Sequence, residues 1–353
     1  MPSLDSSIQD VSTTGMYEAF ASTLKALMST KKAALAGDES LRVLGVAKNS
    51  VTTDMKLRTA SVNKSEDVVR RALGSMQKLN LTMKAPEVRK FLDASDKSTQ
   101  SAIDRLSNIM QRNEKATATA VDALTAAAQT AARLAAKGAQ SQGYAHSAER
   151  VLFGTEPGSR GFAASEAAKV AASKATAVAA NAKVASNEIR QALKLMEHQK
   201  INGPPPLVDR ALKDLHVAKK NLEIAKVYAD ATDGTRAEWS RTYFQIFSAL
   251  KFLQGHLRMV DAFTADDTAT LKILNHAEAA LAKVRDAVAA ADAAGANVET
   301  VLDPTGAMKE ELAILDKARA AAQAAKIAKQ GFGMEQVSLG LACTRRAQFA
   351  DFI

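Results

Sequence analysis

The sequence predicts an all-α protein that consists of a long Ala-rich antiparallel helical hairpin and a C-terminal four-helix bundle. Composition points to helices, because aromatic residues make up 5% of the 353 residues and only 7 residues are Pro and 17 are Gly. The abundant Ala, Lys and Glu are strong helix formers. Apolar residues also recur at spacings of three and four over long stretches, which is the period of a buried helical stripe.

Composition shifts and helix breakers divide the chain into four predicted segments. We expect an N-terminal arm with short helices, then the Ala-rich hairpin, then the four-helix bundle, then a C-terminal tail. In that order the segments are residues 1–97, 98–200, 201–333 and 334–353.

The first segment is predicted to begin with a Ser- and Thr-rich mobile arm over residues 1–13. Short helices follow, and the first of them is expected to end before Gly37. Residues 49–63 are rich in Thr and Val, so this stretch is a candidate short strand.

The hairpin segment is predicted from two stripes at alternating spacings of three and four residues, in which Ala is frequent. Residues 98–137 contain no Pro or Gly, and Gly138 is expected to stop the first helix. Small side chains on facing stripes would let the two helices approach to about 8 Å, the short end of the usual range. The stripes run through Ile103, Leu106, Met110, Asn113, Thr117, Ala120, Leu124, Ala127, Ala131 and Leu134, and through Ala171, Ala175, Val178, Ala182, Ala185, Ile189, Ala192 and Met196.

The bundle segment opens with the break "INGPPPLVDR", because consecutive prolines cannot continue a helix. Four helices are predicted after it, and Thr264 with Asp267 has the capping-box spacing that would start the third. An aromatic helix is expected at the centre, with its core formed by Trp239, Tyr243, Phe247, Leu250 and Leu257. The predicted helices cover residues 206–231, 236–262, 265–294 and 305–330.

The sequence contains no recognisable catalytic, cofactor or metal signature. The five His residues are far apart and form no H-x-x-x-H pair, and Cys343 is the single cysteine. Residues 158–161 precede a long helix, where an anion is favoured, although a loop without a ligand is the simpler interpretation. We therefore expect no enzymatic activity, no metal and no cofactor.

A basic stripe is predicted on the second helix of the hairpin. At 100° per residue, Lys169, Lys183, Arg190 and Lys194 fall within an arc of about 60°, roughly 140° from the Ala stripe. Arg160 precedes them near the start of the helix. The stripe could contact a phosphate backbone, an anionic surface or an acidic neighbouring protein, or it could simply solvate an exposed helix.

These features predict a structural or assembly subunit that works through self-association or contacts with other protein subunits. The net charge of +9 leaves sequence-independent nucleic-acid packaging as an alternative. A second alternative, ranked lower, is an amphipathic hairpin that binds a membrane or granule surface. With no signal peptide and no transmembrane stretch in the sequence, we expect a soluble chain in the cytoplasm or within a large assembly.

Overall fold

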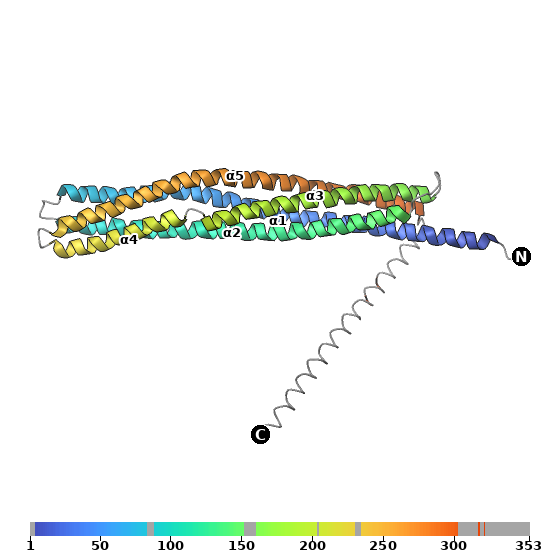
Figure 1. Cartoon of the computed structure of the whole chain (residues 1–353), viewed down its shortest axis with the longest axis horizontal. Coiled ribbons are helices and arrows are strands. Elements are labelled where there is room, and N and C mark those ends of the chain that lie inside the picture. Colours follow the sequence, from blue (N-terminus) through green and yellow to red (C-terminus); the bar gives the residue numbers. More distant parts are fainter. Residues whose placement is uncertain are drawn as a thin grey trace, which may run out of the picture. The chain divides into compact units, whose positions relative to one another are not determined.

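A computed structural model describes residues 4–82, 88–151, 160–202, 205–229 and 234–302, together with residues 317 and 321. All regular elements in these ranges are α-helices, so the predicted all-α class is confirmed (Figure 1). They are α1 (Leu4–Thr82), α2 (Val88–Val151), α3 (Arg160–Asn202), α4 (Pro205–Tyr228) and α5 (Gly234–Leu302).

Helix α1 is continuous where the sequence predicted an arm, several short helices and a strand. It includes residues 4–13, passes Gly37 and contains the whole of residues 49–63, so the predicted strand is wrong. The Thr residues of this stretch fit a helix because Thr52 and Thr53 each donate a hydrogen bond to the carbonyl four residues earlier, both at 2.8 Å.

Helix α2 also continues through its expected stop at Gly138. A Cβ atom added at Gly138 would lie 2.9 Å from the Cα atom of Ala179 in α3. This position therefore requires a residue without a Cβ atom because α2 and α3 approach closely here, and not because the helix ends.

The predicted division of the C-terminal half into four helices is wrong at Thr264. Helix α5 runs through this residue, and the Thr264 hydroxyl donates to the carbonyl of Val260 at 2.8 Å instead of capping a new helix. Except for residues 317 and 321, the predicted helix 305–330 and the predicted tail 334–353 lie outside the described residues.

The chain divides into two compact units, and neither coincides with a segment predicted from the sequence. One unit comprises Met1–Ser29, Gln142–Lys174 and Ala289–Ile353. Among its described residues, the ammonium of Lys25 lies 4.6 Å from the ring centroid of Tyr144. The larger unit comprises Thr30–Ser141 and Ala175–Val288 and contains the surfaces described below.

The larger unit is a helical bundle that contains residues of α1, α2, α3, α4 and α5 (Figure 1). Helices α1, α2 and α5 run along the bundle, and α3 and α4 follow one another along it. The predicted bundle of C-terminal helices alone is therefore not what forms the core. Contacts that join these helices include Ser75 with Ser98, Lys48 with Glu278, Lys226 with Asp96, and Glu188 with His276.

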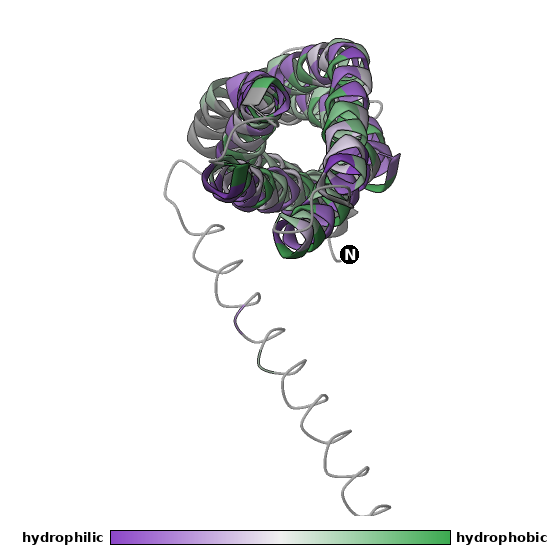
Figure 2. Ribbon diagram, turned by 90° about the vertical axis from the view of Figure 1, so that its left-hand side faces the viewer, coloured by the Kyte–Doolittle hydropathy of each residue, from purple (hydrophilic) through white to green (hydrophobic). Residues whose placement is uncertain are grey.

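Two apolar clusters form the core of the larger unit. The first includes Leu44, Leu124, Ile189 and Leu281, and the second includes Leu79, Leu106, Leu222 and Ile246, all of them fully buried. Figure 2 looks along these helices and shows apolar and polar residues alternating around each ribbon. Each cluster contains residues from several helices, so packing in the core holds distant parts of the sequence together.

Candidate functional site

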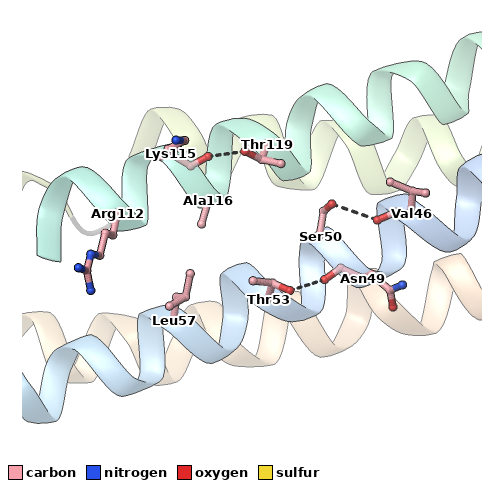
Figure 3. Close-up of a pocket in the computed structure, with 9 residues that line it drawn as sticks. All are labelled: Val46, Asn49, Ser50, Thr53, Leu57, Arg112, Lys115, Ala116 and Thr119. Atoms are coloured by element: carbon pink, nitrogen blue, oxygen red, sulfur yellow. Dashed lines mark hydrogen bonds between the residues drawn. The ribbon is translucent and has the colours of Figure 1, made fainter.

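A shallow groove runs between α1 and α2 on the surface of the larger unit (Figure 3). It encloses about 450 Å³. Leu57 points from α1 toward α2, while Ala116 points from α2 toward α1. The lining residues are Val46, Asn49, Ser50, Thr53 and Leu57 of α1 and Arg112, Lys115, Ala116 and Thr119 of α2.

The groove combines short side chains at its centre with positive charge along one wall. The hydroxyls of Ser50, Thr53 and Thr119 donate to carbonyls of their own helices at 3.0, 2.8 and 2.8 Å. Arg112 and Lys115 are the charged residues of the lining, and both are exposed. The groove is therefore suited to a second backbone that carries carboxylates or other anions.

Beneath the groove, a buried polar cluster separates the two apolar clusters. Its centre is Arg58, whose guanidinium contacts the Asp54 carboxylate and donates to Oε1 of Gln199 at 3.1 Å. The same guanidinium lies 3.5 Å from Oδ2 of Asp267. All four residues are at most 3% exposed, so one cation and two carboxylates share the interior of the bundle.

Hydroxyl and amide groups of α1 and α2 extend this cluster. Thr117 donates to Oδ1 of Asp54 at 2.9 Å, and the Asn113 amide donates to the Ser61 hydroxyl at 2.8 Å. Ser61 donates in turn to the carbonyl of Arg58 at 2.8 Å. These bonds fix the register of α1 against α2, because a shift of one residue would leave buried polar groups without partners.

Burial dominates the protonation equilibria of the two carboxylates. It raises the pKa of Asp54 against the opposing effects of the Arg58 charge and the Thr117 hydrogen bond. Burial likewise raises the pKa of Asp267, with the Arg58 charge again opposing it. The charged form of each carboxylate is therefore less favourable here than in water.

A second surface feature lies on α5, where Tyr243, Phe244 and Phe247 form what we call the aromatic surface. The Tyr243 ring stacks on Trp239 at 5.4 Å and on Phe247 at 6.5 Å between centroids. Phe244 is 67% exposed and Phe247 is 38% exposed. The ammonium of Lys251 lies 5.0 Å from the Phe247 centroid, which places a cation at the edge of the surface.

The exposed rings correct the predicted core of this helix. Trp239 and Leu250 are buried as expected, but Tyr243 and Leu257 are half-buried and Phe247 is exposed. The core stripe of α5 instead runs through Ile246, Ala249, Leu253 and Val260. Helix α5 is therefore apolar on one buried face and aromatic on a neighbouring exposed one.

The predicted basic stripe lies on α3. Lys183, Arg190 and Lys194 are exposed there, on the opposite side of the helix from the buried Ala stripe. Lys169 is also exposed and pairs with Glu166 at 2.7 Å. Arg160 is the first residue of α3, but its side chain and residues 152–159 lie outside the described part of the chain.

Neither a metal site nor a membrane span is present among the described residues. Within them, no three His, Cys, Asp or Glu side chains are placed to hold a metal ion. No described helix combines the length and apolar character needed to cross a membrane.

Sequence reasoning missed the buried polar cluster, although a signal for it was present. Asp267 lies at seven-residue spacing on the stripe that carries Leu253, Val260, Leu274 and Leu281. A carboxylate on an apolar stripe indicates a buried ion pair, whereas its spacing from Thr264 favoured a helix cap. Comparison with known proteins adds no assignment, because no protein-family model and no curated protein sequence matches the chain.

Proposed function

We propose that the chain is a non-enzymatic structural subunit that assembles through protein–protein contacts on the outside of its helical bundle. The observation that carries this proposal is the aromatic surface. When a partner covers apolar rings, the free energy of binding becomes more favourable by about 25 cal/mol for each Å² of apolar surface removed from water. Exposed clusters of aromatic side chains are typical of surfaces at which proteins bind one another.

The support beneath the rings strengthens this interpretation. Tyr243 is held between Trp239 and Phe247, and Trp239 is only 6% exposed. The rings are thus ordered before a partner arrives, so little side-chain entropy is lost on binding. A long helix that presents pre-ordered rings is well suited to a scaffold, and self-association or binding of other subunits would bury them.

The test compares the wild-type chain with the F244S/F247S variant by size-exclusion chromatography with light scattering. We expect the assembly to lose mass in the variant while its helicity stays the same. Val227 is 76% exposed on α4, so V227S is a matched control that removes an exposed apolar side chain elsewhere. An assembly that responds equally to V227S and F244S/F247S would contradict a specific role for the aromatic surface.

A second candidate function is sequence-independent nucleic-acid binding through α3. The exposure of Lys183, Arg190 and Lys194 on one side of this helix supports it. Such binding depends steeply on salt, because phosphate contacts release counterions. We expect K183E/R190E/K194E to abolish it, and binding that is unaffected by salt or by this variant would exclude the candidate.

A further inference from the structure

We infer that the α1/α2 groove receives a ridge on helix α5 of a second copy of this chain. This inference rests on the proposed assembly function and identifies one contact that would produce it. The ridge consists of Asp261, Ala262, Ala265, Asp266 and Ala269, all exposed on the outer face of α5.

The ridge and the groove are complementary in charge. Asp261 and Asp266 are the exposed charged residues between positions 261 and 269, because Asp267 is buried. The charged residues that line the groove are Arg112 and Lys115. Arg258 and Lys272 lie three residues beyond the two ends of the ridge, and Glu114 lies between the two groove cations in the sequence. These charges oppose the attraction, so it arises only between the two Asp residues of the ridge and the two cations of the groove.

The two surfaces are also complementary in size. Ala262, Ala265 and Ala269 present methyl groups, and Ser50, Thr53 and Ala116 present short side chains from the groove. Helices that meet through short side chains can approach to about 8 Å. From Val46 to Leu57 the groove spans about 16 Å, and the ridge spans about 12 Å, at 1.5 Å per residue.

A chain cannot fill its own groove with its own ridge. Asp267 of α5 lies 3.5 Å from Arg58, and Thr117 of α2 lies 2.9 Å from Asp54, so ridge and groove lie at similar levels of the bundle. Buried Asp267 fixes α5 with its ridge facing outward, while the groove opens between α1 and α2. The ridge that enters the groove must therefore come from another copy.

This contact joins two different surfaces, so after the first contact forms one copy still offers a free ridge and the other still offers a free groove. Such head-to-tail contacts close into rings or extend into filaments, depending on the rotation between copies. The groove would thus make the chain a repeating unit of an assembly.

The test uses charge reversal on each surface of the full-length chain and measures mass by sedimentation velocity after nuclease treatment. We expect R112E/K115E and D261K/D266K each to weaken self-association by at least about tenfold. Mixing the two variants restores it, because each then offers a surface that complements the other. K283E/R285E reverses two charges on α5 away from the ridge and should change little.

Three results would overturn the inference. Self-association that persists in R112E/K115E and is lost in F244S/F247S would place the contact at the aromatic surface, and the proposed function would stand. Two variants that stay apart when mixed would exclude the pairing of groove with ridge. A wild-type chain that is monomeric at every concentration tested would exclude contact between copies altogether.

Discussion

The guanidinium of Arg58 lies 3.5 Å from Oδ2 of Asp267, a residue 209 positions later in the sequence. This contact joins α1 to α5 across the core of the larger unit. It lies between two apolar clusters, so the ions are shielded from water and depend on one another. The stability of the bundle is therefore sensitive to any change that leaves one of these charges alone.

Replacing Arg58 with Met should destabilise the bundle by about 3–5 kcal/mol, because two buried carboxylates lose their cation. The measurement is the free energy of unfolding from urea denaturation. Arg71 pairs with Asp67 at 2.7 Å on the surface, so R71M serves as a control and should have little effect. The variant R58M/D54L/D267L removes all three charges and should recover most of the loss. A single R58M variant as stable as R71M would contradict this account.

The pH dependence of stability should reveal the two buried carboxylates. Since burial raises the pKa of Asp54 above its unfolded value, the folded state holds this proton more tightly. The contribution of Asp54 to stability is therefore fully present below the unfolded pKa, near pH 4, and declines as the pH rises toward the folded pKa. The same sign applies to Asp267.

Replacement by Asn removes this decline. The free energy of unfolding of D54N, taken relative to the wild type, should increase as the pH rises above about 4, the pKa of the unfolded carboxyl group. D122N, which replaces an exposed carboxylate on α2, is the matched control for the substitution itself. A relative stability of D54N that falls as the pH rises would have the wrong sign for a carboxyl group with a raised pKa.

The close approach of α2 and α3 should make Gly138 intolerant of a side chain. Alanine is the better helix former by about 1 kcal/mol, yet G138A should destabilise the protein because its Cβ would lie 2.9 Å from the Ala179 backbone. At Gly45 an added Cβ would meet no atom within 4 Å, so G45A should instead raise the melting temperature. Thermal unfolding that ranks the two variants in the opposite order would refute the close contact.

Sequence periodicity predicted the buried face of α3 residue by residue. Ala175, Val178, Ala182, Ala185 and Ile189 were expected on one stripe, and all of them are fully buried. This succeeded because the spacing of apolar residues depends directly on the helical repeat.

Helix ends could not be predicted equally well, because Gly and Thr mark turns only when no neighbour stabilises the helix. Gly37 and Gly138 lie within helices at points of close contact, where added Cβ atoms would approach Val284 and Ala179. Asp267 resembled a cap in sequence because its partner, Arg58, lies in a distant helix. The local sequence around a tertiary contact of this kind does not identify the partner residue.

The surfaces proposed for function were predicted only in part. The basic stripe on α3 was expected, and Lys183, Arg190 and Lys194 are exposed there. The α1/α2 groove was not expected, because its lining residues lie on different helices and meet only through packing. Phe247 was assigned to the core because this helix is apolar around much of its circumference, whereas Phe247 is 38% exposed.

The most direct test of the assembly proposal is the mass of the full-length chain, purified without nuclease and measured by light scattering during size-exclusion chromatography. Absorbance at 260 and 280 nm is recorded together. We predict a particle heavier than the 37.4 kDa chain, with a protein spectrum that nuclease does not change. A particle with excess absorbance at 260 nm that shrinks after nuclease would favour nucleic-acid packaging. A monomer that binds no other protein subunit would contradict the proposal.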